Sequence, residues 1–383
     1  MSQAPPPIGE PHEETPIDAL PKSDSSSQYP CSNCGAKLEF KPGAVSLTCP
    51  YCQSETPIPQ SEEDVVEIDF HTQLAELASQ EETEEHTQVK CNECGAQVDK
   101  PEGVTSMECP YCGTAIVMTG VSAKLIKPKS LLPFHITKQQ ATAAFQQWIK
   151  GLWFAPNKLK QYARMDSGLR GMYVPHWTYD SDTISFYRGQ RGDDYTVTKT
   201  RTNAEGKTET YTATETRWTS VSGTVYVSFD DVLVLATNSL PRKYADKLEP
   251  WDMQNLVNYS DDYLAGFGSE SYQLDLAEGF GVAQEKMDGP IRTAINSDIG
   301  GDHQRISSKK TQYNNVTFKH ILLPIWINAY KYADKAYRFL VNARTGEVQG
   351  ERPWSWVKIT LAVLGGLAII GGIAAVIAMS QGG

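Results

Sequence analysis

The first third of the sequence has few basic residues. Residues 1–120 contain 21 Asp and Glu against 5 Lys and Arg, a net charge of −16, whereas the whole 383-residue chain has −11 and the remainder therefore +5. Proteins that bind a nucleic-acid backbone use Lys and Arg to displace its counterions. Bound zinc would not supply this charge, because four thiolates around Zn²⁺ carry about −2. The composition therefore argues against nucleic acid as a partner.

A complete nucleotide-binding loop is also missing. Gly206-Lys207-Thr208 resembles the end of a phosphate-binding loop, but that pattern needs a glycine five residues earlier, where Arg201 stands. The segment lies between threonine-rich stretches, so we predict a hairpin turn. We find no helicase motif and no catalytic pairing by spacing, and we expect no enzyme. An unrecognised site in the larger domain, near His176 or His320, is the open alternative, although a lone strand histidine is more typical of a packed residue.

No cysteine lies outside four Cys-x-x-Cys pairs. Two such pairs separated by a hairpin make a zinc ribbon, in which tight turns direct four thiolates at one ion. Residues 91–112 repeat residues 31–52 at an offset of 60, including the letters CPYC, which indicates an internal duplication. The expected metal ligands are Cys31, Cys34, Cys49 and Cys52 in the first copy and Cys91, Cys94, Cys109 and Cys112 in the second.

We expect two structural zinc sites. A closed four-cysteine site leaves no open position for a substrate, and metal binding of about 10–16 kcal/mol would supply folding energy. Iron in a rubredoxin-like site has the same ligand set and is the alternative metal. Gly35 and Gly95, just after the second cysteine of each copy, allow the unusual dihedral angles of the turn. Free thiolates fit a reducing, intracellular compartment.

The composition divides the chain into six segments. We predict a disordered tail at 1–30, a first zinc ribbon at 31–57, an acidic linker at 58–88, a second zinc ribbon at 89–120, an α+β domain at 121–353 and a transmembrane anchor at 354–383. The ribbons are expected to be separate units on a flexible linker. Within it, Val65, Ile68, Leu74 and Leu77 could form a short apolar face. That face predicts either a solvated spacer with a transient helix or a docking segment for a partner.

The α+β domain shows both helix and strand patterns. We predict a helix at 136–151 that begins with a capping box of Thr137 and Gln140, and a second helix at 275–298. An exposed hairpin is expected at 194–218, and strands with a turn at 342–346 close the domain. The segments LLPFHI, YVPHWTY and LLPIWINAY share a Pro-aromatic pattern and could be equivalent strands of a repeated unit.

The C-terminal segment is a long apolar run. Residues 359–379 are 21 uncharged residues, and a helix of that length is about 31 Å long, the thickness of a bilayer core. Trp354 and Trp356 fit an interfacial belt, and Arg352 and Lys358 fit the cytoplasmic side. The start of the chain lacks the pattern of a signal peptide. We expect a single-pass anchor in the cell (inner) membrane with the N-terminal domains in the cytoplasm.

Small residues form a stripe along this run. Gly365, Ala368, Gly372 and Ala375 could allow two helices to approach closely, which predicts a homo-oligomer through the transmembrane helix. The alternative is that Gly and Ala are simply common in membrane helices.

Several strings resemble a known family. They are LLPFHITKQQATAAFQQWIKGLWFAP, GMYVPHWTYD, YLAGF and LLPIWINAYKY with YRFLVNARTGEVQGERPWSWVKI. The chain resembles bacterial membrane-anchored tandem zinc-ribbon proteins, often named primosomal protein N′ (replication factor Y) or superfamily II helicase-like. Related membrane proteins work with SPFH (flotillin-like) and PspA-like partners. The resemblance implies a membrane adaptor that recruits protein partners, and a nucleic-acid accessory factor without a motor is the alternative.

Overall fold

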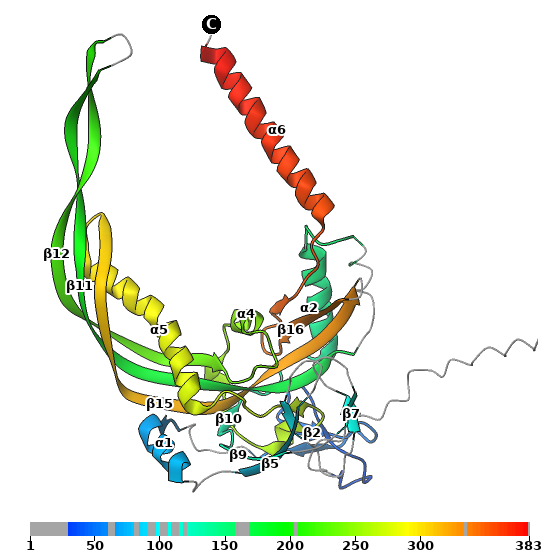
Figure 1. Ribbon diagram of the computed structural model, residues 1–383. Helices are drawn as coiled ribbons and strands as arrows, with labels where there is room; N and C mark the ends of the chain where they lie inside the picture. Colours follow the sequence, from blue (N-terminus) through cyan, green and yellow to red (C-terminus); the bar gives the residue numbers. More distant parts are fainter. Residues whose placement is uncertain are drawn as a thin grey trace, which may run out of the picture.

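The computed structural model describes residues 30–59, 66–79, 84–90, 97–99, 106–108, 115–117, 121–157, 159, 168–202, 206–332 and 335–381 (Figure 1). The predicted tail, apart from its last residue, lies outside them, as do all four cysteines of the second copy. The described part has helices and one large sheet, as the predicted α+β class requires.

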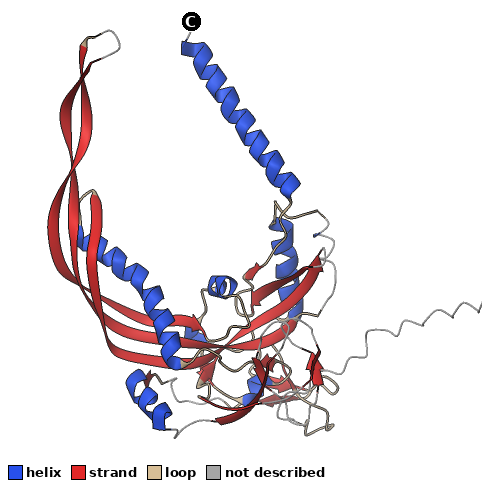
Figure 2. Ribbon diagram, viewed as in Figure 1, coloured by secondary structure: helices blue, strands red, loops and turns tan. Residues whose placement is uncertain are grey.

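Three very long strands build the large sheet. Strand β11 (Arg170–Thr202) lies in the middle and pairs antiparallel with β12 (Thr208–Leu235) and with β15 (His303–Tyr332). The strands curve strongly, and helix α5 lies on the inside of the curve (Figures 1 and 2). Because β15 begins opposite Gly192, β11 and β12 continue beyond it as a two-stranded hairpin. We call residues 193–202 and 208–217 the arm.

Short elements complete the sheet and its surroundings. The strands are β10 (Ser130–Leu131), β13 (Val257–Asn258), β14 (Gly268–Ser269), β16 (Lys335–Asn342), β17 (Val348–Gly350) and β4 (Ile68–Asp69). Short helices are α4 (Arg242–Ala245), η2 (Asp246–Leu248), η3 (Met253–Asn255) and η4 (Asp261–Leu264). The three Pro-aromatic segments meet in this sheet, but they are not equivalent strands. Leu131 pairs in parallel with Leu322, yet β10 has only 2 residues, and YVPHWTY runs antiparallel to β15.

Both predicted helices of the domain are present. Helix α2 (Lys138–Gly151) begins at the capping box of Thr137 and Gln140. Helix α5 (Leu276–Ile299) begins at a second capping box, formed by Asp275 and Glu278. One face of α5 is buried at every fourth residue, which covers the concave side of the sheet. These residues are Gly279, Ala283, Met287, Ile291, Ile295 and Ile299.

Part of the predicted acidic linker is packed against the sheet. Ile68 and Asp69 pair with β15, and helix α1 (Phe70–Ser79) follows at once. The Phe70 side chain is 4% exposed and lies 4.7 Å, between ring centroids, from Phe280 of α5. The apolar face of residues 66–79 is therefore packed on the chain's own sheet, where burial of Phe70 stabilises it, while the other face of the segment is exposed.

Strands also pair around the second cysteine copy. Strand β5 (Glu84–Lys90) pairs with β6 (Gln97–Asp99) and with β9 (Val121–Leu125). In the same region β7 (Ser106–Glu108) pairs with β8 (Ala115–Val117). Strands on both sides of the predicted borders at 88/89 and 120/121 thus belong to one sheet.

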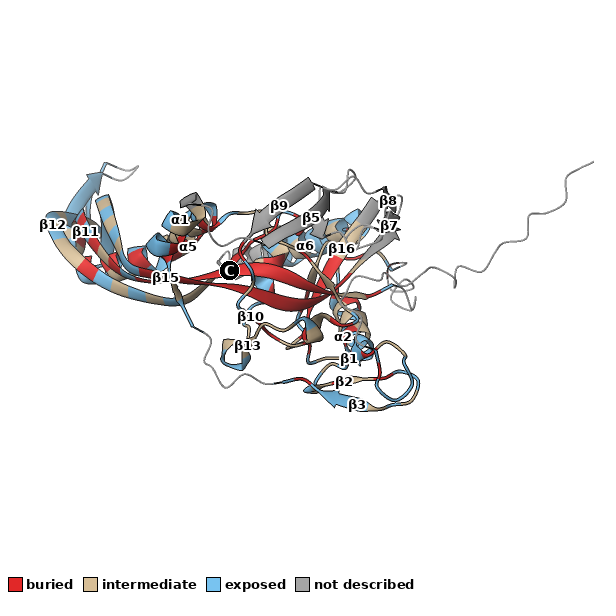
Figure 3. Ribbon diagram, turned by 90° about the horizontal axis from the view of Figure 1, so that it is seen from below, coloured by how far each residue is buried: buried red, intermediate tan, exposed pale blue. Residues whose placement is uncertain are grey.

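The chain's apolar C-terminal run forms helix α6 (Trp356–Gln381). Its window Trp356–Ile373 has a mean hydropathy of 1.9 and none of it is buried, so the helix is long and apolar enough to cross a membrane. Buried residues instead follow the central strands, whereas the arm is exposed (Figure 3).

Candidate metal centre

The four cysteines of the first copy lie together. Their sulfur atoms are all within 4.8 Å of one another, with 3.6 Å between Cys31 and Cys52 and 3.5 Å between Cys34 and Cys49. Four thiolates at about 2.3 Å from a tetrahedral zinc ion would be about 3.8 Å apart. The group therefore has the size that a metal ion with four sulfur ligands requires.

Two turns of the same geometry place these sulfur atoms. In the first, the N–H of Gly35 donates to the carbonyl of Cys31 (2.8 Å), whose own N–H donates to Ala36 (2.7 Å). In the second, Gln53 donates to Cys49 (3.0 Å), and Cys49 donates to Ser54 (2.9 Å).

The residue after the second cysteine of each turn has a left-handed backbone. The φ angle is 74° at Gly35 and 59° at Gln53. Glycine adopts this conformation without steric cost, which explains Gly35, whereas a glutamine there is strained. The second sequence copy has glycine at the position equivalent to Gln53, residue 113.

Ser54 is a site residue that the cysteine spacing did not indicate. Its hydroxyl oxygen lies 3.0 Å from the sulfur of Cys31 and 3.2 Å from that of Cys52. The side chain and the N–H of Ser54 lower the pKa of Cys52 to about 5, and the side chain also lowers the pKa of Cys31. Thr114 occupies the same place in the second copy, so the shared hydroxyl was a usable signal.

The fourth thiol indicates what a cation would contribute to the group. The N–H of Ala36 favours the thiolate of Cys34, but the neighbouring thiols of Cys49 and Cys52 outweigh it and raise the pKa of Cys34 to about 12. Four thiolates at this spacing repel one another, because like charges disfavour ionisation. A divalent metal ion among them would remove that penalty, and the donor set fits zinc or iron.

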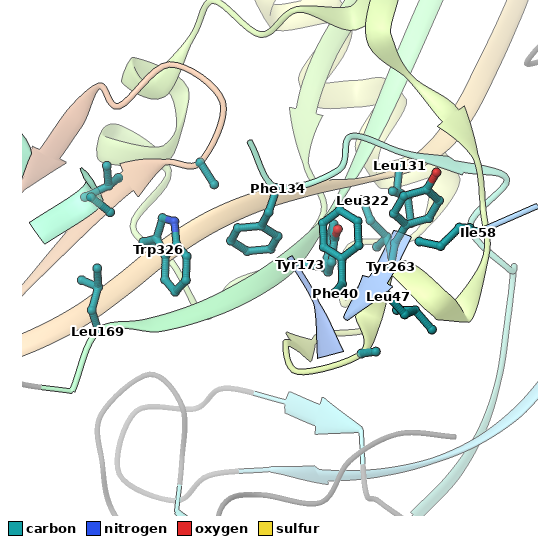
Figure 4. Close-up of a cluster of buried hydrophobic side chains, with 14 of the residues drawn as sticks. Phe40, Leu47, Ile58, Leu131, Phe134, Leu169, Tyr173, Tyr263, Leu322 and Trp326 are labelled. Carbon is teal, nitrogen blue, oxygen red and sulfur yellow. The ribbon is translucent and has the colours of Figure 1, made fainter. Parts of the chain in front are cut away.

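The first cysteine unit, residues 31–57, is part of the core of the larger domain. Its strands are β1 (Glu39–Phe40), β2 (Ser46–Thr48) and β3 (Glu55–Pro57). Its buried side chains pack in one cluster with those of the large sheet (Figure 4); the cluster includes Leu38, Phe40, Leu47, Cys49, Leu131, Phe134, Tyr173 and Tyr263. The unit is therefore not the separate module that its motif predicts.

Backbone hydrogen bonds connect the same two parts. The N–H of Phe40 donates to Ala265 (2.9 Å), and that of Gly43 donates to Phe134 (2.9 Å). Tyr51 and Val45 of the unit remain 81% and 67% exposed. The unit thus has one buried side and an outer surface that carries exposed apolar groups.

The second predicted set of ligands lies outside the described residues. Cys91, Cys94, Cys109 and Cys112 therefore stay a prediction from the duplicated spacing.

A second group of potential ligands is acidic. Carboxylate oxygens of Glu67, Asp180 and Asp230 lie within 4.8 Å of one another. Lys319 already supplies a cation there, with its amino group 3.1 Å from Glu67 and 2.8 Å from Asp231. Burial raises the pKa of Asp180 to about 6, against the opposing N–H of Asp231 and charge of Lys319. We interpret this group as the polar attachment of the docked linker to the sheet.

The two strand histidines are packed residues. His176 and His320 are buried, and each places Nδ1 3.0 Å from a backbone carbonyl, that of Val174 and that of Ile126 respectively. Burial lowers the pKa of each to about 4, so both are neutral at pH 7. The sequence Gly206-Lys207-Thr208 leads into β12, and Gly206 has φ 77°, as a hairpin turn requires.

Comparison with known proteins gives a distant relative. The chain is similar to the uncharacterized protein YdjG of Bacillus subtilis (strain 168). The two sequences are 28% identical over 332 residues, which cover 86% of this chain and 91% of that protein. No family model matches the chain, and no solved structure matches it. A likeness of this length extends well beyond the two cysteine copies and into the α+β domain.

Proposed function

We propose that the protein is a tail-anchored membrane adaptor, in which cytoplasmic zinc ribbons recruit protein partners to the inner membrane. The supporting observation is that one chain joins a four-cysteine unit, packed into the core of a folded domain, to an apolar helix whose window Trp356–Ile373 has no buried residue. The four sulfur atoms would hold a structural zinc ion, which leaves no open position for a substrate. The family resemblance implies that the partners are of the SPFH or PspA-like class.

The base of α6 supports the membrane part of the proposal. Trp153, Trp354 and Trp356 are 77%, 50% and 79% exposed. The amino group of Lys358 lies 3.1 Å from the carbonyl oxygen of Trp153, which brings the loop after α2 to the start of the helix. Exposed tryptophans and a lysine at one end of an apolar helix are typical of a membrane–water interface.

The outer surface of the first cysteine unit is the candidate docking face. Tyr51 lies between two candidate ligand cysteines and is 81% exposed, so the cysteine turn presents its ring to solvent. Aromatic side chains are common anchors of protein interfaces. A partner that covers Tyr51 would bury apolar area at a small cost in side-chain entropy.

Purification of the full chain in mild detergent tests the proposal. We expect a membrane partner to co-purify with the wild type, to be lost with Tyr51→Ser, and to bind again when the two purified proteins are mixed. Tyr226→Ser is the matched control, because Tyr226 is 74% exposed but lies on the large sheet, outside the cysteine unit. Metal content, measured by mass spectrometry, should be the same in both variants, with zinc rather than iron present.

A further variant tests the second cysteine copy. Cys91→Ser/Cys94→Ser should also lose a partner if both ribbons recruit. Retention of the same partners by Tyr51→Ser and by this double variant would contradict the adaptor proposal. Nucleic acid that co-purifies and is released by salt would favour the accessory-factor alternative.

A further inference from the structure

Strand β12 has an open edge along the arm. Within the described sheet, β12 lies at the end of the strand order and pairs with β11. Strand pairing is obstructed at the C-terminal end of β12. There Asp231 has a left-handed backbone (φ 51°), and the amino group of Lys286 donates to the carbonyl of Leu233 (2.7 Å). From residue 208 to residue 229 the strand is regular and continuous.

Such an edge is a template for another strand. It presents a row of backbone N–H and C=O groups that a second strand can pair with. The arm also extends beyond the last residue pair of β15, at Gly192 and His303, and a two-stranded hairpin without a third strand is marginally stable. An added strand would therefore both satisfy the edge and stabilise the arm.

The side chains of the arm alternate regularly between its two faces, while the two strands twist around each other (Figure 1). On one face threonines oppose threonines, at 196/214, 198/212, 200/210 and 202/208. On the other face Lys199 pairs with Glu215 (2.7 Å), and Arg201 pairs with Glu209 (3.4 Å). The threonines are β-branched and therefore favour extended strands. They also leave no bulky side chain on their face of the arm beside the edge.

We propose that two copies of this chain dimerise through the edges of their β12 strands, antiparallel and with Ala213 on the two-fold axis. A two-fold interface must be complementary to itself. The register centred on Ala213 meets this requirement. It places Glu209 opposite Arg217 of the partner subunit and Tyr211 opposite Glu215 of the partner subunit. Tyr195 already donates to Glu215 within the arm (3.0 Å), so a tyrosine–glutamate pair suits this surface.

The neighbouring registers are less favourable. With Thr212 on the axis, Glu209 would oppose the partner's Glu215 and Lys207 would oppose the partner's Arg217, and like charges directly opposite are destabilising. With Thr214 on the axis, Glu209 would oppose the partner's Thr219 and gain no cation from the partner subunit. The charge pattern therefore selects the register centred on Ala213.

The edge of β11 is less suitable for pairing. It is open only over residues 193–202, because β15 covers the strand up to Gly192. The turn before β15 adds to the obstruction, since the N–H of Asp302 donates to Gly192 (2.8 Å) and its carboxylate accepts from the N–H of Asp194 (2.8 Å). The proposal therefore assigns the interface to β12.

A charge swap tests the proposal on the full chain in detergent. Glu209→Arg should raise the dimer dissociation constant about tenfold, because two attractive pairs become repulsive. Arg217→Glu should do the same, and the combined variant should return to within about threefold of the wild type. Sedimentation equilibrium measures the dimer dissociation constant of the wild type, the two single variants and the combined variant.

If Glu209 and Arg217 acted only through contacts within one chain, the dissociation constants of the variants would follow a different pattern. Within the arm, Glu209 pairs with Arg201 and Arg217 lies over the ring of Tyr195. If only these contacts mattered, the combined variant would be worse than either single variant instead of rescued. Equal dimerisation of all four proteins would overturn the proposal and assign the dimer to α6, and a monomeric wild type would overturn it as well.

Disulfide formation provides an independent check of the register. In the proposed dimer, Ala213→Cys places the new thiol beside the same thiol of the partner subunit. Mild oxidation should therefore give a covalent dimer. Val197→Cys is the matched control, because Val197 is the direct partner of Ala213 in the hairpin but would lie three strands from its own copy, about 14 Å. Cross-linking of Val197→Cys as readily as Ala213→Cys, or of neither, would contradict the interface.

Discussion

The two ends of the large sheet are built from the same strands but depend on different interactions. Near the first cysteine unit, Tyr173 of β11 is fully buried, and Cys31 and Cys49 of the two cysteine turns belong to the same core. In the arm, the same strand carries threonine and charged side chains that are mostly exposed. Burial of apolar area dominates at one end, whereas cross-strand pairs worth about 0.2–1 kcal/mol each hold the other. The first end should therefore be sensitive to single substitutions and the second tolerant of them.

The largest effect is expected at the two cysteine turns of the first unit. Cys49→Ser removes one of the four candidate metal ligands, and its side chain is fully buried in the shared core. We expect the free energy of unfolding to fall by about 4 kcal/mol or more, as for loss of a structural metal, and the Tm by roughly 10 °C. Hydrogen exchange should rise around Tyr173 of β11 as well as in the turns.

Tyr51→Ser is the control for this change, because it alters an exposed residue of the same turn. A Cys49→Ser protein whose exchange increases only within residues 31–57 would show that the unit is separate from the core after all.

The next effect concerns the packing of α5 on β11. A Cβ atom at Gly279 would lie 2.4 Å from the hydroxyl of Tyr179 and 2.8 Å from Cδ1 of Trp177. Gly279→Ala should therefore destabilise the protein by about 1–3 kcal/mol. Gly281→Ala, on the same helix with no atom within 4 Å of its Cβ, should stabilise it by up to about 1 kcal/mol. Urea unfolding followed by tryptophan fluorescence measures both, and effects of the same sign would contradict the packing argument.

A smaller effect depends on pH at the docked linker. The pKa of Asp180 is raised to about 6, from an ordinary value of 3.8. An acid with a raised folded-state pKa contributes stability that is present below pH 4 and is lost as the pH rises through 6. Asp180→Asn should match the wild type near pH 4 and exceed it at pH 7 by about 1 kcal/mol, since partial exposure screens the effect. Unfolding at several pH values checks this, and a constant difference across the range would contradict it.

The smallest effect is expected in the arm. Lys199→Gln breaks an ion pair with Glu215 in which both side chains are 40–47% exposed. We expect a loss of at most about 0.5 kcal/mol in global stability. Hydrogen exchange of residues 193–202 should increase while that around Tyr173 stays unchanged. A global loss above about 1 kcal/mol would show that the arm is coupled to the core more tightly than the comparison implies.

Local signals predicted much of the fold. The capping box at Thr137 marks the start of α2, because side chain and backbone satisfy each other within one turn. The helix at 275–298 was also predicted, but its capping box at Asp275 and Glu278 was not used as a signal. The turn around Gly206 predicted the hairpin of β11 and β12. The cysteine spacing predicted which four sulfur atoms come together in the first copy.

Long-range packing could not be predicted in the same way. Phe70 and Ile68 sit in an acidic stretch, and nothing near them in sequence shows that they cover β15 and α5. Leu38, Phe40 and Leu47 look like the small interior of a ribbon, but they are buried against residues more than 80 positions away. Burial of this kind depends on which surfaces meet after folding, which a single sequence does not contain as a local pattern.

The arm and α6 leave the body on the same side (Figure 1). Threonine-rich strands with open edges cannot lie in hydrocarbon, because their backbone groups would lose the water that satisfies them. A bilayer crossed by α6 must therefore exclude the arm, so the angle between the two has to open at residues 351–355, which form no helix or strand. Residues 351–355 would then determine the tilt of the folded domain relative to the membrane surface. Spin labels at the arm tip and at the end of α6 should move apart on transfer into nanodiscs, and an unchanged distance would contradict this consequence.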